Sequence, residues 1–557
     1  MTYDNPRIPK ILDTLGRFCT RHPLMVLTIV LLAQCVFTLD ARALWFSDEV
    51  RYANAFENLL NGHWLVLHLN GQMYPDKPPV YFWFMWLVSK LGGGATPVTF
   101  FASSALSALL YLFATHFMCR RIANEDNTTS LITGLFFLTS LYFIGLGQYL
   151  RMDLLFGVFI LASQFFFYFG VNNEQNNAYN VLAFVLAGVA TLTKGPLGAV
   201  FPLLGVIVFL AWKGDLRRLF RKDMLLGLVL MLLMLGAWVG GAYMIEGKAY
   251  IDNIFYKQIY RRAVNTWHHE EPFYYYLTAL PLVCLPWTFI VVLLPFRRLG
   301  KAAFWKDLWE RRRAAQGTTY LWVLFLTGFC MLSLLSGKVA IYLLPVLAPL
   351  AILGAKGLRR AAELHHGRLP WMWICVALFC FIMVLAAPFF EIFCPWPVTV
   401  AGLGFVTLIM GATGAAVLAV RRMGIGPALA VFVLGITLVL QPLKLMTLPS
   451  INAGMSPKAM AMVIRDYVSH GFSPAAYDIY SGIFTYYAGR DILESDYFED
   501  MAKNFAEHPG KGIAVFKEKD WKRWDKKPEG LKVVFRQWIV DRPYVLVSNE
   551  ASATPKD

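Results

Sequence analysis

Long apolar stretches separated by short polar connections cover most of the first 450 residues of this chain. A helix needs about 20 apolar residues to cross the hydrocarbon layer of a bilayer. About thirteen stretches approach this length; they lie at 23–44, 97–118, 128–147, 152–172, 178–193, 196–212, 223–246, 275–296, 318–336, 339–355, 369–388, 398–420 and 425–446. A further apolar stretch, 79–91, is too short to cross and predicts an interfacial or re-entrant helix.

The first apolar stretch has two interpretations. Arg17 and Arg21 precede an apolar run that ends near Ala41, which is the order of features in a secretory signal peptide. However, the run from Pro23 continues with few breaks to Trp45, long enough to cross a bilayer. We therefore expect it to be retained as the first transmembrane helix.

Lysine and arginine predict which side of the membrane each connection faces, because they accumulate on the cytoplasmic side. If the N-terminus is inside and 79–91 does not cross, every dense basic cluster becomes cytoplasmic. These clusters are 7–21, 120–121, 213–222, 297–313, 356–368 and 421–422. If 79–91 crossed, two of the clusters would face outside. The pattern therefore predicts that the connections 45–96 and 247–274 lie outside the cytoplasm, together with the chain from about residue 450.

The composition supports a polytopic membrane protein. Hydrophobic residues make up 57% of the 557 residues and charged residues only 16%, whereas soluble domains are about 25% charged. The net charge of +15 then reflects cytoplasmic connections, and we expect no nucleic-acid partner. The eight cysteines show no paired spacing, which predicts neither a disulfide framework nor a cysteine-ligated metal. We see no glycine-rich phosphate loop, so a nucleotide-driven mechanism is disfavoured.

The last hundred residues have a different character. Ser456 and Pro457 are a typical helix N-cap and first helical residue. The segments 512–516 and 544–547 are short apolar runs typical of buried strands. We predict a polytopic α-helical domain over 1–449 and a small extracytoplasmic α/β domain over 450–557.

Charged and aromatic residues gather on the predicted outer side, where the topology rule expects few cations. They are Asp48, Glu49, Arg51 and Tyr52; Tyr74, Asp76 and Lys77; Arg151 and Asp153; Lys194; Arg261, Arg262, His268 and His269; and Lys338 with Tyr342. These residues come from connections far apart in sequence. If they meet, they form one polar site at the outer membrane surface.

Each of these residues also has an ordinary structural interpretation. Asp48 could begin a helix capped by Ser47, with Asp48, Arg51 and Tyr52 on one face, lying on the bilayer. Asp153 precedes an apolar span, where carboxylates are costly and usually functional, but it could simply pair with Arg151.

The cations allow a similar choice. Lys77 and Lys194 could extend from the membrane toward water, and Arg261 and Arg262 could contact lipid headgroups. His268 and His269 could contribute to a zinc site, although a solvated loop is the preferred interpretation. Together, however, so many cations on the outer side indicate an anionic partner, and phosphate suits arginine, lysine and tyrosine. The sequence therefore predicts a site for a phosphate-bearing lipid with carboxylates nearby.

Several short motifs resemble those of the GT-C glycosyltransferases that use polyprenyl-phosphate sugars. They are SDEVRYAN at 47–54, Tyr-x-x-Lys-Pro-Pro at 74–79, RMDLL at 151–155, TKGPLG at 193–198 and HEEPFYYY at 269–276. Within that superfamily the chain most resembles the bacterial 4-amino-4-deoxy-L-arabinose lipid A transferases. The resemblance covers essentially the whole chain.

The resemblance implies an enzyme of the Gram-negative inner membrane whose site and C-terminus are periplasmic. It would transfer the aminosugar from undecaprenyl phosphate to lipid A phosphates and protect against polymyxin-type cationic peptides. We expect a monomer. The alternatives are a bacterial protein O-mannosyltransferase, or another polyprenyl-phosphate-dependent glycosyltransferase. A transporter is disfavoured because the charges lie in connections and no internal repeat is visible.

The resemblance also implies roles for individual residues. Asp48 and Asp153 match catalytic aspartates, with Glu49 beside them, and Arg51, Tyr52 and Lys194 would contact the sugar or the acceptor. The positions that match the donor phosphate site are Tyr74, Lys77, Arg262 and Tyr342. His269 and Asp76 match a metal pair, for which zinc is the expected divalent ion. Asp76 departs from the family, which often has glutamate there, and the residues before Tyr342 follow the family only loosely.

Overall fold

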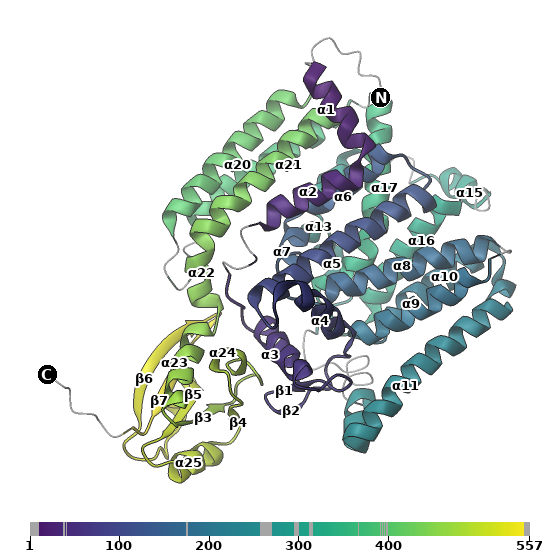
Figure 1. The fold of residues 1–557 in the computed structure, drawn as a ribbon. Coiled ribbons are helices and arrows are strands. Elements are labelled where there is room, and N and C mark those ends of the chain that lie inside the picture. Colours follow the sequence, from purple (N-terminus) through teal and green to yellow (C-terminus); the bar gives the residue numbers. More distant parts are fainter. Residues whose placement is uncertain are drawn as a thin grey trace.

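The computed structural model describes residues 10–36, 39, 42–173, 176–256, 270–293, 300–310, 316–365, 367–389, 392, 394, 396 and 399–550. Figure 1 shows a large body of tilted helices and, at one end of it, a small domain that contains the main β-sheet. Between them lies a thin layer of short elements from the first outer connection. This layer places the candidate site between the two parts.

Every predicted membrane segment contains at least one helix. In chain order these are α2 (Pro23–Cys35), α5 (Pro97–Phe117), α6 (Asn127–Leu138) with α7 (Leu141–Leu146), α8 (Asp153–Asn172), α9 (Ala178–Lys194), α10 (Leu197–Lys213), α11 (Lys222–Asp252), α13 (Tyr275–Val283) with η4 (Trp287–Leu293), α16 (Gln316–Leu334), η5 (Ala340–Leu343) with α17 (Leu344–Glu363), α18 (Leu369–Ala386), α20 (Val400–Val420) and α21 (Ile425–Pro442). Within the described residues, eight helices are long and apolar enough to cross, or up to ten if two bent pairs count as spans. The remaining predicted segments hold shorter apolar helices.

Two helical pairs are bent, one just before the first predicted span and one within the segment predicted at 275–296. The helical pair 14–21 and 23–35 turns by 98°, and the pair 275–283 and 287–293 turns by 102°. Each break contains or adjoins a proline, Pro23 in the first and Pro286 in the second. Proline has no backbone N–H to donate and its ring collides with the preceding turn, so a helix cannot continue through it unchanged.

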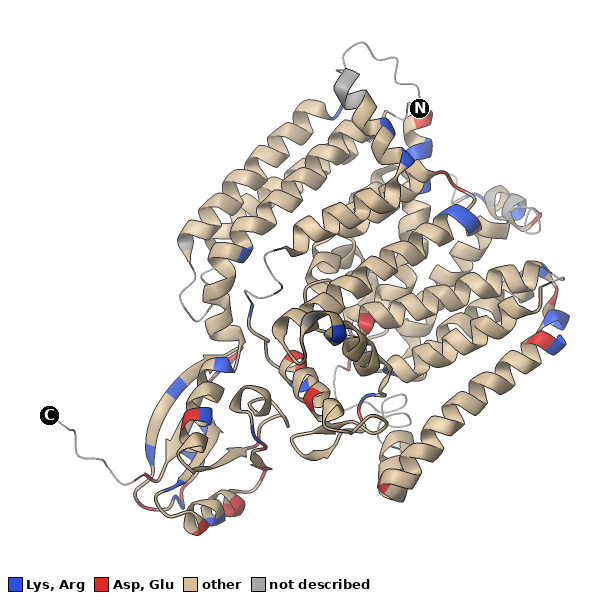
Figure 2. Cartoon of the chain, viewed as in Figure 1, with Lys and Arg blue, Asp and Glu red and all other residues tan. Residues whose placement is uncertain are grey.

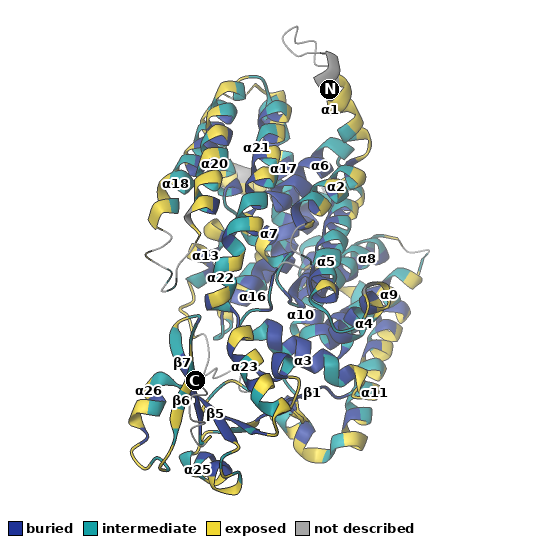
Figure 3. Ribbon diagram, turned by 60° about the vertical axis from the view of Figure 1, so that its left-hand side comes forward, coloured by how far each residue is buried: buried dark blue, intermediate teal, exposed yellow. Residues whose placement is uncertain are grey.

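Buried residues concentrate along α5, α6 and α17, whereas α11, α18 and α20 expose apolar side chains outward (Figure 3). Only 17% of the residues in an 18-residue apolar stretch of the helix that contains α11 are buried inside the protein. An apolar surface that the protein itself leaves uncovered is the surface a membrane helix presents to lipid.

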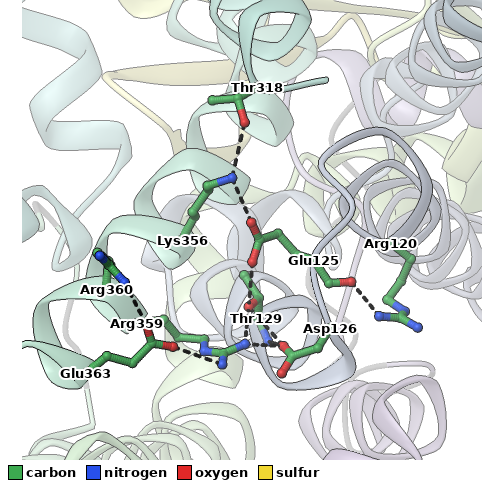
Figure 4. Close-up of polar contacts among 9 residues, drawn as sticks. All are labelled: Arg120, Glu125, Asp126, Thr129, Thr318, Lys356, Arg359, Arg360 and Glu363. Carbon is green, nitrogen blue, oxygen red and sulfur yellow. Dashed lines mark hydrogen bonds and ion pairs between the residues drawn. The ribbon is translucent and has the colours of Figure 1, made fainter. Parts of the chain in front are cut away.

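Lysine and arginine gather at the end of the helical body away from the small domain (Figure 2). An ion-pair cluster there joins the start of α6 to α17 and α16 (Figure 4). Lys356 Nζ lies 2.8 Å from Glu125 Oε1 and donates to Thr318 at 3.1 Å, while Arg359 pairs with Asp126. These contacts fasten the end that the charge pattern predicts to be cytoplasmic.

The layer at the opposite end is formed by α3 (Asp48–Leu60), the hairpin β1 (His68–Leu69) and β2 (Gln72–Met73), and α4 (Val80–Gly92). Helix α4 is the short apolar segment that we expected not to cross, and its 13 residues are too few for a bilayer. Ser47 occupies the N-cap position of α3, as predicted, but its side chain makes no capping hydrogen bond to the described residues. Two acidic residues in the first turn still suit the positive end of the helix.

The small domain begins after α22 (Leu448–Met455), which continues the direction of α21. It contains α23 (Lys458–Ser469), β3 (Ser473–Tyr477), α24 (Thr485–Ala488), β4 (Leu493–Ser495), α25 (Phe498–Glu507), β5 (Gly512–Lys517), α26 (Glu518–Arg523), β6 (Lys532–Ile539) and β7 (Arg542–Ser548). The sheet order is β4-β3-β5-β7-β6, parallel on the β4-β3-β5 side and antiparallel on the other. The two predicted strands are confirmed as β5 and β7. Helix α23 begins one residue later than the sequence suggested.

Candidate functional site

Four charged residues from three connections that we predict to face outward form a continuous chain of ion pairs. Asp48 Oδ2 at the start of α3 lies 3.2 Å from Arg151 Nη2. Arg151 Nε in turn donates to Asp153 Oδ2 at 3.1 Å. The other oxygen of Asp153 accepts a hydrogen bond from Lys194 Nζ at the end of α9. Three of the connections that the charge pattern predicts to face outward therefore meet at one place.

The chain of charges continues on both sides. Arg51 Nη1 lies 4.0 Å from Asp48 and its Nη2 4.0 Å from Asp76. The Arg51 guanidinium also lies 5.2 Å from the ring centre of Tyr74. On the other side, Lys194 Nζ lies 4.4 Å from the ring centre of Tyr342.

Lys77 and Tyr52 complete this cluster. Lys77 is close enough to Asp153 to stabilise the ionised carboxylate. Tyr52 is buried and packs edge-on against Tyr81 at 6.3 Å and Phe82 at 5.8 Å between ring centres. Tyr52 therefore fixes α3 onto α4 beneath the charged residues.

Exposure separates the residues of the cluster by role. The side chains of Asp48 and Arg151 are 25% and 27% exposed, so both can reach a bound molecule. Asp153 is only 2% exposed and is enclosed by Arg151 and Lys194. This geometry makes Asp153 a residue that holds two cations in place, whereas Asp48 and Arg151 lie at the accessible surface.

The two arginines stay protonated in this setting. Burial by itself would lower the pKa of Arg151, but Asp153 and Asp48 outweigh burial and raise it above its ordinary value. Burial likewise opposes the charge of Arg51, and Tyr74, Asp48 and Asp76 raise its pKa. Both guanidinium groups are therefore fixed positive charges with several donors each.

Glu49 is placed differently from its neighbour Asp48. It is fully buried, and Arg42 Nη1 donates to its Oε2 at 2.8 Å while Arg42 Nη2 donates to its Oε1. The backbone N–H groups of Trp45 and Leu150 also donate to this carboxylate, each at 2.7 Å. All these donors come from protein, and this argues against the catalytic role predicted for Glu49. Its position instead ties the first outer connection to the one before α8.

Two predicted site residues, Arg262 and His269, lie outside the described residues. Asp76, the other half of the predicted metal pair, lies beside the Arg51 guanidinium, and a neighbouring cation disfavours a second one. Among the described residues, no group of three or more histidine, cysteine or acidic side chains is arranged to hold a metal ion. The metal site therefore stays a prediction.

The sequence placed Arg151 among the outer charged residues but gave it no role beyond pairing with Asp153, and so missed its central position. The signal was present, because an arginine two residues before a boundary aspartate lies on the side where cations are scarce. Arg42 was missed for a different reason. Its partner Glu49 and the Gln148 carbonyl, to which it donates at 3.0 Å, come together only through tertiary packing.

The arrangement defines a multi-span membrane protein with a charged site on one side, overlaid by a small α/β domain. Residues 76–241 match the family model described as dolichyl-phosphate-mannose-protein mannosyltransferase. Across 96% of this chain and 100% of the other, the structure resembles the crystal structure of ArnT from Cupriavidus metallidurans bound to undecaprenyl phosphate, with a TM-score of 0.74 and 20% identity. The apo form of that protein gives 0.73.

The sequence relatives are named as aminoarabinose transferases. The chain is 32% identical over 330 residues to the undecaprenyl phosphate-alpha-4-amino-4-deoxy-L-arabinose arabinosyl transferase of Enterobacter sp. (strain 638), covering 57% of this chain and 56% of that one. It is 29% identical over 369 residues to the enzyme of that name from Aeromonas hydrophila, covering 63% of each chain. These matches span little more than half of each relative's length. The chain therefore has the fold of that crystal structure, and its sequence resembles these transferases over little more than half of its length.

Proposed function

We propose that this protein transfers 4-amino-4-deoxy-L-arabinose from undecaprenyl phosphate to a phosphate group of lipid A at the periplasmic face of a Gram-negative inner membrane. The observation that carries the proposal is the single cluster made by Asp48, Arg151, Asp153 and Lys194. The proposal is supported by a set of fixed cations that lie at one end of an apolar helical body. A lipid with an anionic headgroup has the same two-part character.

In the proposed reaction, an oxygen of the lipid A phosphate forms a bond to the anomeric carbon of the sugar. The bond from that carbon to the donor phosphate breaks, and its electron pair leaves with undecaprenyl phosphate. Negative charge therefore grows on the leaving phosphate. Arg151, Lys194 and Lys77 supply preorganised positive charge for it, which is an electrostatic form of catalysis.

The acceptor determines what Asp48 has to do. A lipid A phosphate is already ionised, so no proton has to be removed from it. Asp48 lies between two guanidinium groups at 3.2 and 4.0 Å, which fixes the direction of its carboxylate. We assign it to orienting the sugar, whose ammonium group an aspartate can bind. With a hydroxyl acceptor, the same carboxylate would instead accept the proton.

Mass spectrometry of lipid A tests the proposal. Cells with and without the gene are compared under conditions in which the donor is made. We expect an added aminopentose on lipid A phosphate only when the gene is present. Unmodified lipid A together with altered glycoproteins would overturn the proposal in favour of protein O-mannosyl transfer, the reaction that the family model's description names.

A further inference from the structure

The turn of the β1–β2 hairpin inserts into the C-terminal domain. Asn70 and Gly71 form this turn, with φ angles of +51° and +70°. Asn70 is buried, with 6% of its surface exposed. Asparagine tolerates this backbone conformation better than most side chains do.

The side chain of Asn70 binds the domain through three hydrogen bonds. Its Nδ2 donates to the Ile492 carbonyl at 2.7 Å, and its Oδ1 accepts from the Ile492 N–H at 2.8 Å. The same oxygen accepts from the Thr485 hydroxyl at 2.9 Å. The backbone N–H of Asn70 donates to Asn54 of α3 at 2.8 Å, so one residue links α3, the hairpin and the domain.

The hairpin leads directly into the charged cluster. Strand β2 ends at Met73, and Tyr74 follows, with its N–H donating to the Leu67 carbonyl at 2.8 Å. Asp76 and Lys77 come two and three residues later. A displacement of the turn is therefore passed along a few residues to the groups of the site.

The domain also contacts the cluster itself. The Ser481 carbonyl accepts a hydrogen bond from Arg51 Nε at 3.1 Å. The next residue, Gly482, donates to Glu494 at 2.8 Å, which holds the loop in place. A Cβ atom on Gly482 would lie 2.5 Å from the Leu69 side chain of the hairpin. The loop that contains Ser481 and Gly482 is therefore in close contact with the hairpin.

We infer that the C-terminal domain positions the phosphate-binding groups of the site. Asn70 is the positioning residue, because its hydrogen bonds connect the domain to the hairpin that leads into the site. The ligand named in this inference rests on the proposed function. A site held in its binding geometry before the ligand arrives loses less free energy on binding, so loosening it weakens affinity without removing a contact.

Asn70→Gly tests this inference most directly, because glycine keeps the turn's backbone conformation and deletes only the side-chain bonds. Thr485→Val removes one of the same bonds from the domain's side at nearly constant volume. Asn124→Gly is the matched control. Asn124 also has a positive φ, +54°, but its side chain is exposed and it lies in the turn between α5 and α6, at the other end of the helical body.

The full chain in detergent is measured in two ways. Binding of undecaprenyl phosphate and the KM for the sugar donor report on the site. Hydrogen exchange of residues 72–77 reports on the segment that joins the hairpin to the site. We expect Asn70→Gly to weaken binding and raise KM about tenfold, with kcat changed less than about twofold and exchange of 72–77 accelerated. Thr485→Val should shift both readouts in the same direction by less, and Asn124→Gly should shift neither.

The outcomes separate the inference from the proposed function. Faster exchange of 72–77 with unchanged donor affinity would overturn the inference, because the domain would then stabilise the loop without positioning the site. Unchanged exchange would overturn it as well. If the wild-type chain does not bind undecaprenyl phosphate while exchange still depends on Asn70, the proposed function fails and the hold of the domain on the loop stands.

Discussion

Asp48→Asn should reduce sugar transfer at least about 100-fold while leaving the protein folded. The substitution keeps the shape of the side chain and removes its charge. Asp48 contacts Arg151 at 3.2 Å and is a quarter exposed, so its loss changes the site more than the fold. Transfer is measured with purified protein, a lipid-linked donor and lipid A, and the melting temperature is followed in the same detergent.

The control for this substitution is Asp466→Asn in α23, whose side chain is 75% exposed. It should leave both transfer and melting temperature unchanged. Near-normal turnover in Asp48→Asn would contradict the assignment of Asp48 to the reacting site. A drop in melting temperature that parallels the loss of transfer would assign Asp48 to the fold instead.

Glu49→Gln should lower the melting temperature and leave sugar transfer nearly unchanged, the opposite of Asp48→Asn. It leaves the buried guanidinium of Arg42 without a counter-charge, and breaking a buried ion pair from one side costs about 3–5 kcal/mol. We expect the melting temperature to fall by about 5 °C or more. The transfer rate of the protein that remains folded should stay near normal, because Glu49 contacts no accessible part of the site.

Glu363→Gln provides the comparison. Glu363 also accepts from an arginine, Arg359 at 3.2 Å, but it is nearly half exposed. Exposed ion pairs contribute about 0–1 kcal/mol, so its melting temperature should barely change. Equally small changes in melting temperature in both variants would show that the buried Glu49 carboxylate does not stabilise the fold, although it accepts hydrogen bonds from four donors.

These adjacent carboxylates show how far the sequence alone can lead. The motif placed both at the start of a helix and suggested similar roles. The side toward which each points depends on α3's packing, which brings Glu49 to Arg42 and Leu150 and leaves Asp48 at the surface. A linear pattern contains no such information about Leu150, which comes from another connection, although Arg42 precedes Glu49 by only 7 residues.

The membrane segments were the most predictable part. Each of the segments predicted from hydrophobic length contains at least one helix. Hydrophobic length and the distribution of basic residues follow directly from the cost of placing polar groups in lipid. The bends near Pro23 and Pro286 were not predicted. A proline tolerated within a membrane helix and one that breaks it differ in the packing around them.

The convergence of the outer connections was predicted as a whole but not in its details. The excess of cations where few were expected pointed to one anionic ligand, and the chain of pairs through Arg151 is consistent with that reasoning. The contribution of the C-terminal domain could not be foreseen. It depends on Asn70 and Ser481 meeting residues more than 400 positions away in sequence.

The proposed function requires that the cluster around Arg151 and Lys194 binds the phosphate of a lipid. Its most direct test is native mass spectrometry of the purified chain with undecaprenyl phosphate, comparing wild type with Arg151→Gln, Lys194→Gln and, from the opposite end of the molecule, Lys356→Gln. We expect one bound lipid in the wild type and in Lys356→Gln, and no bound lipid in the two site variants, each confirmed as folded by its melting temperature. Retention of the lipid by folded Arg151→Gln and Lys194→Gln protein would contradict the proposed function.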